Sequence, residues 1–234
     1  MAILTDVSQP DPVDRLARGA LDAFGAVQVV CNNAGVGTSN GAPVWEASRA
    51  DWEWVLGVNR WGVINGIRSF VPILLEQEQG HVVNTASMAG LLPGNLGIYS
   101  VTKHAVVALS EALQIQLAMR GARVGVSVLC PGFVRTRIMD AERNRPDRYQ
   151  VRGRSSPEPA AQQLRELMRQ RVEAGTPPSQ VASVVVDAIR DERFYVLPHP
   201  EWVPLVRQRM EDIEHGRPPS LRSLGAVQAA ASTS

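Results

Sequence analysis

The sequence predicts a doubly wound α/β domain, in which a parallel sheet carries helices on both faces. Three observations support this fold class. Short runs rich in β-branched residues alternate with longer segments of helical periodicity. The polar motifs stand directly after such runs or at the start of such helices. The 234 residues, 44% of them hydrophobic and 20% charged, are enough to bury a core without disulfides.

The charge and the cysteine count exclude several classes of function. Lys and Arg total 24 against 23 Asp and Glu, and this balance predicts neither a nucleic-acid nor a membrane partner. No apolar stretch approaches the roughly 18 residues that span a bilayer, and the residues after Met1 do not resemble a signal peptide. Cys31 and Cys130 cannot form a disulfide framework or a cysteine-rich zinc site. We therefore expect two buried free thiols, a cytoplasmic protein and no metal.

The segments follow one another as the strands and helices of a single domain, residues 1–215. Asp11 and Pro12 predict a helix start with Asp11 as N-cap, and Gly25 predicts its end. A helical pattern over residues 48–76 contains three glycines and a proline, which predict kinks. Buried strands are expected over 27–31, 81–86, 124–130 and 193–197, and further helices over 99–120, 161–174, 179–190 and 203–215.

Two polar segments differ from this pattern. Residues 133–160 predict a lid, in which the arginines between 135 and 154 alternate with acidic residues. This mixture favours a solvated lid over a binding site for an anionic substrate. Residues 216–234 are rich in Pro, Ser and Ala and predict a disordered tail.

Tyr99 and Lys103 stand four residues apart at the start of a predicted helix, so their side chains share one face. An ammonium beside a phenol lowers the pKa of the tyrosine, which suits proton transfer to or from an alcohol or carbonyl oxygen. Such pairs are also common on helix surfaces. Ser87 strengthens the functional interpretation because it follows a strand end, where open α/β sheets bind ligands and where a hydroxyl can hold the reacting oxygen.

Three further motifs occupy similar positions. Asn32-Asn33-Ala34-Gly35 follows the 27–31 strand and Pro131-Gly132 follows the 124–130 strand, although each is also compatible with an ordinary turn. Asn59 interrupts an apolar helical pattern, where asparagine is a poor helix former and often simply faces solvent. All of these motifs face the same edge of the predicted sheet.

The combined pattern resembles the short-chain dehydrogenases/reductases over about residues 2–200. The resemblance implies a Rossmann-type sheet and NAD(P)-dependent interconversion of an alcohol and a carbonyl by hydride transfer, and it does not discriminate between NAD and NADP. It also implies a homodimer or homotetramer. The motifs that carry it are Asn32-Asn33-Ala34-Gly35, Asn59, Ser87, Tyr99-Ser-Val-Thr-Lys103 and Pro131-Gly132 with Thr136.

The resemblance also assigns roles to individual residues. Tyr99 is the general acid/base, and Lys103 lowers its pKa and binds the nicotinamide ribose. Ser87 positions the substrate oxygen, and Asn59 supports a proton-relay water. Cofactor contacts are implied for Asp6 and Val7 at the adenine, for Asn33, Ala34 and Gly35 along the cofactor, and for Pro131, Gly132, Val134 and Thr136 beside the nicotinamide.

The pattern departs from the family before Asp6, where no glycine-rich turn for the pyrophosphate is found. We expect a first βαβα block of about 50–60 residues to be absent. Either Met1 is an internal start of a longer protein, or the chain is this short and the 27–31 strand is an exposed edge. Gly35-Val-Gly37 leads to Asn40-Gly41 rather than to a helix, so it does not replace that turn. The chain is therefore expected to bind NAD(P)H only at millimolar concentration.

Two hypotheses for function remain. In the first, an apolar pocket closed by the lid binds hydrophobic secondary alcohols or ketones. In the second, a non-catalytic chain binds a homologous partner through helices at about 48–77 and 99–120. A hydrolase is not expected, because no G-x-S-x-G motif surrounds Ser87. The predicted pocket residues are Leu91, Leu92 and Leu96 after Ser87, and Phe133, Ile138 and Met139 after Pro131-Gly132.

Overall fold

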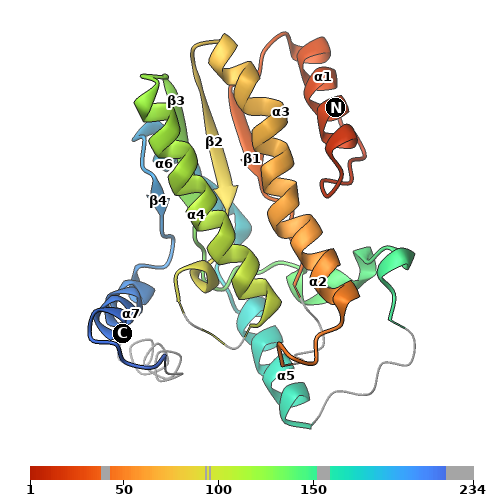
Figure 1. Ribbon diagram of the computed structural model, residues 1–234, viewed down its shortest axis with the longest axis vertical. Coiled ribbons are helices and arrows are strands. Elements are labelled where there is room, and N and C mark those ends of the chain that lie inside the picture. The colour runs from red at the N-terminus through yellow and green to blue at the C-terminus, as the bar shows by residue number, and fades with distance from the viewer. Residues whose placement is uncertain (38–42, 93, 95, 152–158, 220–234) are drawn as a thin grey trace.

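Figure 1 shows the computed structural model, which describes residues 1–37, 43–92, 94, 96–151 and 159–219. Strands and helices alternate along the first two thirds of the chain, and helices dominate the remainder. The strands are β1 (Val29–Asn32), β2 (Gly80–Thr85), β3 (Val124–Leu129) and β4 (Tyr195–Val196). The helices are α1 (Pro10–Phe24), α2 (Arg49–Leu56), α3 (Gly62–Glu76), α4 (Ile98–Met119), α5 (Pro159–Glu173), α6 (Pro178–Arg190) and α7 (Val203–Glu214).

The strands form one sheet in the order β1-β2-β3-β4, and all neighbours are parallel. Val83 of β2 pairs with Cys31 of β1 on one side and with Ser127 of β3 on the other. Leu129 of β3 pairs with Val196 of β4. The predicted parallel sheet is confirmed, and the carboxyl ends of its strands meet at one edge.

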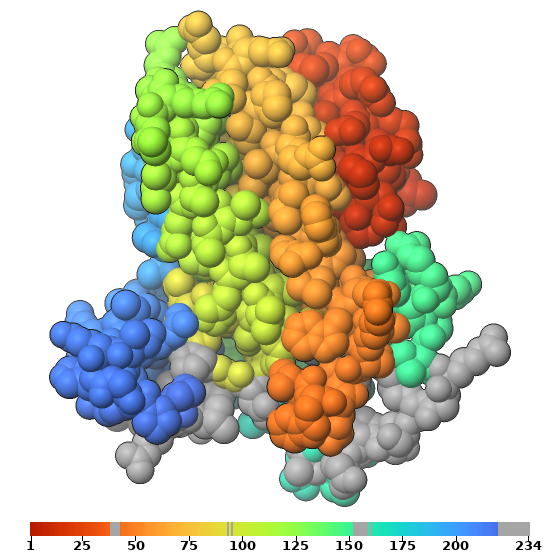
Figure 2. Space-filling view, viewed as in Figure 1, coloured from red at the N-terminus to blue at the C-terminus, as the bar shows by residue number. Residues whose placement is uncertain are grey.

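Helices cover both faces of this sheet (Figure 1). α1, α3 and α4 pack on one face, where Val30 and Val82 are buried, and Figure 2 shows α3 and α4 side by side across it. α6 packs on the opposite face against Val83 and Leu129. Successive residues of β2 therefore enter two different cores, which explains the uninterrupted apolar run in the sequence. The doubly wound α/β class is confirmed.

The helical region predicted over residues 48–76 consists of two helices joined by a π-helical turn. α2 begins with a capping box, in which Ser48 and Asp51 each bond the other's backbone N–H. The π-helical turn spans Gly57–Trp61, contains Asn59 and directs that side chain into the interior, where it is fully buried. The glycines thus predict an interruption correctly, whereas Pro72 lies inside α3 without ending it.

α1 begins at Pro10 rather than at Pro12, and its N-cap residue is Gln9, so the prediction of Asp11 as N-cap is wrong. Asp11 lies in the first turn instead, where the helix dipole favours a carboxylate. Gly25 ends the helix as predicted. Its φ of 76° is a left-handed conformation that glycine adopts without strain.

Two expectations about exposure are also wrong. Cys130 is buried as predicted, but Cys31 is exposed because β1 is an edge strand of the described sheet. Arg145, in the predicted solvated lid, is buried because it pairs with Asp51 of α2 at 2.8 Å and lies over the ring of Trp54. This contact fixes the segment from Ile138 to Tyr149 against α2. Residues 152–158 of the lid and 220–234 of the tail lie outside the described residues.

Candidate active site

Tyr99 and Lys103 lie in the first turns of α4, at the carboxyl edge of the sheet. Gly97 precedes the helix with a φ of 47°, which glycine alone tolerates well. Lys103 is 4% exposed, and its Nζ lies 5.6 Å from the centroid of the Tyr99 ring. Nζ donates a 2.7 Å hydrogen bond to the carbonyl oxygen of Thr85. Lys103 therefore connects α4 to the end of β2.

Burial is the main cause of the pKa shifts in this pair. It lowers the pKa of Lys103 from 10.5 to about 8, because the ammonium loses its hydration. It raises the pKa of Tyr99, and a hydrogen bond with Ser87 opposes this only in part. The sequence predicts that Lys103 lowers the pKa of Tyr99. In the structure, desolvation of the buried phenol dominates instead.

Ser87 connects the end of β2 with the turn after β3. Its Oγ accepts a hydrogen bond from the N–H of Ala89 at 3.1 Å, caps the short helix Met88–Gly90, and lies 3.4 Å from the carbonyl oxygen of Pro131. The same hydroxyl hydrogen-bonds Tyr99. Because a serine hydroxyl has one proton and the bond to Pro131 is long, that proton is available to a better acceptor such as a substrate oxygen.

Asn59 fixes the loop after β1 to the active-site helix. Its Oδ1 accepts from the N–H of Val36 at 2.8 Å, and its Nδ2 donates to the carbonyl oxygen of Val36 at 2.9 Å. Nδ2 also donates to Thr102 Oγ1 at 3.1 Å, and this hydroxyl donates in turn to the carbonyl oxygen of Tyr99 at 2.7 Å. Asn59 therefore holds the start of α4 through the residue next to Lys103.

The Asn33 to Gly35 loop lies against the same corner. Thr85 Oγ1 donates to Asn33 Oδ1 at 2.9 Å, while the Thr85 carbonyl accepts from Lys103. A Cβ placed on Gly35 would stand 3.6 Å from both Lys103 Nζ and Asn59 Oδ1. The structure thus brings Asn33, Gly35, Asn59 and Lys103 together.

The Pro131-Gly132 turn borders Ser87 from the other side. The carbonyl oxygen of Pro131 accepts from the N–H of Met88 at 2.9 Å, which places the turn beside the end of β2. The N–H of Gly132 donates to His199 Nδ1 at 3.0 Å. Val134 then pairs with Thr176 in an isolated parallel bridge, and Thr136 is exposed.

Asp6 and Val7, the two residues expected at the adenine, lie in different places. A hollow of about 290 Å³ lies beside β1, and Val7, Asn33 and Ala34 line it together with Gly62 and Val63. Asp6 does not line it. Its carboxylate accepts hydrogen bonds from Ser8 and forms an ion pair with Arg148 at 3.1 Å. Although partial burial would raise the pKa of Asp6, these bonds lower it below its ordinary value.

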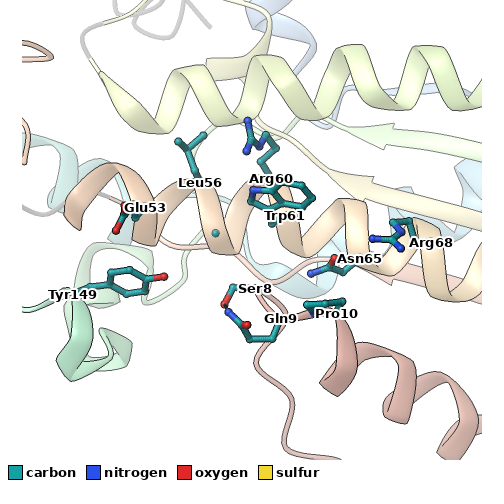
Figure 3. Close-up of a pocket in the computed structure, with 11 residues that line it drawn as sticks. Ser8, Gln9, Pro10, Glu53, Leu56, Arg60, Trp61, Asn65, Arg68 and Tyr149 are labelled. Atoms are coloured by element: carbon teal, nitrogen blue, oxygen red, sulfur yellow. Dashed lines mark hydrogen bonds between the residues drawn. The ribbon is translucent and has the colours of Figure 1, made fainter. Parts of the chain in front are cut away.

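A separate cavity of about 440 Å³ lies between the start of α1 and the α2–α3 segment (Figure 3). Ser8 and Pro10 line one side, and Arg60 and Trp61 line the other. None of the four catalytic candidates borders this cavity, so it is distinct from the site around Tyr99.

Four framework residues of the site were not predicted: Thr85, Thr102, Thr176 and His199. Thr102 and Thr85 had a usable signal, because one stands three residues after Tyr99 on the same helix face and the other ends a strand. His199 had none, since it lies 67 residues from Gly132 in the sequence.

Within the described residues, no cluster of His, Cys, Asp or Glu could hold a metal ion. The helices of that part of the chain include none long and apolar enough to cross a membrane.

Comparisons with known proteins identify the family. Residues 1–147 match the family described as short chain dehydrogenase. The "CLA biosynthesis dehydrogenase/reductase" of Lactiplantibacillus plantarum is 30% identical over 236 residues, which cover 97% of this chain and 80% of that protein. The "1-deoxy-11-beta-hydroxypentalenate dehydrogenase" of Streptomyces arenae is 33% identical over 216 residues, which cover 91% of this chain and 69% of that protein.

The fold agrees with this assignment. The crystal structure of a short chain dehydrogenase/reductase from Burkholderia phymatum in complex with NAD superposes with a TM-score of 0.87 at 46% identity. The match covers 92% of this chain and 76% of that one. The predicted resemblance is confirmed, and the chain belongs to the short-chain dehydrogenase/reductase family of oxidoreductases.

Proposed function

We propose that the protein interconverts an alcohol and a carbonyl compound with NAD or NADP, and that Tyr99 is its general acid/base. The observation that supports this most strongly is the grouping of Ser87 and Tyr99, both half-buried, with the buried Lys103 at the carboxyl edge of the sheet. A hydroxyl, a phenol and an ammonium in contact can hold a substrate oxygen and exchange a proton with it.

The surroundings of Lys103 fit the nicotinamide ribose of such a cofactor. Among the described residues, Thr85 provides the hydrogen-bond acceptor of the ammonium, so further N–H donors remain for a ligand. The bare backbone of Gly35 keeps the adjoining space open. Val7, Asn33 and Ala34 line the hollow that would hold the adenine side. When bound, the cofactor supplies or accepts the hydride.

Ser87 and Tyr99 handle the substrate oxygen and its proton. In carbonyl reduction, the Tyr99 hydroxyl donates its proton to the oxygen that Ser87 holds, and in alcohol oxidation the phenolate takes the proton back. The raised pKa of Tyr99 keeps the phenol protonated near neutral pH. The Lys103 ammonium, charged below its pKa of about 8, favours the phenolate when the proton leaves.

Asn59 supports this chemistry by holding Val36 and Thr102 in place. Both N–H groups of its amide are used, on Val36 and on Thr102, so neither remains for a relay water. The family resemblance implies a relay water. Such a water would therefore donate a hydrogen bond to Oδ1 or to the main-chain carbonyl oxygen of Asn59.

We further propose an apolar substrate, a secondary alcohol or ketone. Leu92 and Phe133 pack in one hydrophobic cluster beside Ser87 and the Pro131-Gly132 turn. Apolar side chains on both segments that flank Ser87 favour an uncharged, apolar substrate over a charged one. A cytoplasmic location and a homo-oligomer stay predictions.

Replacing Tyr99 by phenylalanine tests the proposal. This change keeps the ring and removes the transferable proton, so turnover should fall by roughly 10²–10⁴-fold. Turnover is followed as NAD(P)H absorbance with secondary alcohols or ketones, at cofactor concentrations up to the millimolar range. The matched control is Tyr195→Phe, because the Tyr195 hydroxyl is bonded to Glu111 at 2.6 Å away from the site. Equal turnover of the two variants would overturn the assignment of Tyr99.

A further inference from the structure

The turn after β3 is held from outside the sheet by one imidazole. The N–H of Gly132 donates to His199 Nδ1 at 3.0 Å, and His199 is 8% exposed. A Cβ on Gly132 would stand 3.2 Å from the imidazole and from the indole of Trp202. Both rings therefore lie directly against the glycine backbone, and a side chain at this position would push them back by a few tenths of an ångström.

The contacts of His199 fix its tautomer. A backbone N–H can only donate, so Nδ1 must carry the lone pair. Nε2 then carries the proton of the neutral ring, and it lies 3.0 Å from Thr176 Oγ1. His199 thus accepts from Gly132 on one side and donates to Thr176 on the other.

Thr176 holds the next residues of the same loop. Its N–H donates to the carbonyl oxygen of Phe133 at 3.0 Å, and its own carbonyl accepts from the N–H of Arg135 at 3.0 Å. The ring of Phe133 packs edge-on against Trp202 at 5.6 Å between centroids. His199, Thr176 and Trp202 therefore fix residues 132–135 together.

The orientation of this loop matters at the reaction centre. The Pro131 carbonyl, which belongs to the same peptide unit as the Gly132 N–H, accepts from the backbone of Met88 and lies next to the Ser87 hydroxyl. A rotation of this peptide would move the Pro131 carbonyl away from Ser87. The bond from Gly132 to His199 opposes that rotation at one end of the peptide, as the bond from Met88 does at the other.

We propose that His199 is a positioning residue, whose Nδ1 holds the Pro131-Gly132 peptide in the orientation that the bound nicotinamide and Ser87 require. The inference rests on the proposed function for its effect on the cofactor. The hydrogen bond from the Gly132 N–H to His199 does not itself depend on the proposed function.

Two variants of His199 separate a positioning role from simple packing. Asparagine places its Oδ1 close to the former Nδ1 and can accept from Gly132, whereas phenylalanine fills the space and accepts nothing. Amide hydrogen exchange at Gly132 is the direct readout. It should be at least about tenfold faster in His199→Phe than in the wild type, and close to wild type in His199→Asn.

Cofactor titration provides the second readout. The dissociation constant for NADH or NADPH should rise about tenfold in His199→Phe and return toward wild type in His199→Asn. Exchange that accelerates equally at core amides such as Val126 would show a structural role only and overturn the proposal. A His199→Asn variant as impaired as His199→Phe, or unchanged cofactor affinity with faster Gly132 exchange, would overturn it as well. A wild type without cofactor binding would contradict the proposed function instead, while Gly132 exchange still decides the role of Nδ1.

Discussion

Replacing Lys103 by methionine should remove activity and, at neutral pH, remove a destabilising charge. Lys103 is the only lysine of the chain, and burial lowers its pKa from 10.5 to about 8. That gap corresponds to about 3 kcal/mol, by which the charged side chain opposes folding near pH 7. Methionine has a similar length and no charge. Methionine cannot donate a hydrogen bond to the Thr85 carbonyl oxygen, and the loss of this bond should lower the free energy of unfolding by about 1–3 kcal/mol.

The pH dependence separates these two effects. Between pH 8 and 10.5 the unfolded protein binds the Lys103 proton and the folded protein does not, so the wild type gains stability as pH rises through this window. Lys103→Met has no such group and gains nothing from it. The unpaired Thr85 carbonyl costs the variant the same at every pH. The free energy of unfolding of the variant, minus that of the wild type, should therefore fall by about 2–3 kcal/mol between pH 7 and pH 10.

Urea unfolding of both proteins at the two pH values measures this difference. Repeating the comparison in a Tyr99→Phe background removes the neighbouring phenol, which also titrates at high pH. Because the chain has one lysine, a sample labelled at lysine Cε and Nζ gives one side-chain NMR signal, whose titration reports the pKa of Lys103 directly. A midpoint near 10.5, or a stability difference that does not change with pH, would refute the reasoning.

Three other predictions concern the framework of the site. Arg145→Met removes the buried cation that pairs with Asp51 at 2.8 Å and should lower the free energy of unfolding by about 3–5 kcal/mol in urea. Arg49→Met breaks only the exposed pair with Glu53 and should cost under about 1 kcal/mol, so an equal loss in both would contradict this account. Gly66→Ala should destabilise in thermal unfolding although alanine favours helices, because the new Cβ would lie 1.9 Å from Asn32 Oδ1. Gly57→Ala meets only Ser8 at 3.4 Å and serves as its control, and a Gly66→Ala protein as stable as that control would disprove the clash. Asn59→Asp replaces an N–H by an oxygen opposite the Val36 carbonyl and should cost about 1–3 kcal/mol in urea, whereas no loss would mean that this bond is not formed.

The sequence predicts best those parts of the site that are local. Tyr99 and Lys103 share a helix face because they stand four residues apart, and Ser87 directly follows a strand. The glycines around Asn59 predict a broken helix, and the structure places the π-helical turn there. Each of these predictions needs only the period of one element and its neighbouring turn.

The parts that could not be predicted depend on distant partners. Arg145 resembles any solvated lid arginine until Asp51, far away in the sequence, is known to face it across a buried space. His199 stands in an ordinary His-Pro dipeptide, and its role depends on the position of Gly132 after folding. The pKa of Tyr99 is a further example, because proximity to Lys103 predicts a lowered value and burial, which no local pattern reveals, raises it.

The rotation of α4 about its axis decides whether Tyr99 and Lys103 face the sheet edge, and apolar packing alone fixes such a rotation weakly. Buried hydrogen bonds are directional, and α4 is held by them at two depths. Near its start, Asn59 bonds Thr102. About two turns past Lys103, Asn84 of β2 donates to Ser110 at 3.0 Å while accepting from Asn32 of β1 at 2.8 Å. Both asparagines that hold α4 are fully buried, so a rotated helix would leave their amide groups unpaired in the core at a cost of about 1–3 kcal/mol each. The asparagines of the sheet therefore orient the catalytic helix, although neither Asn32 nor Asn84 lies next to Tyr99.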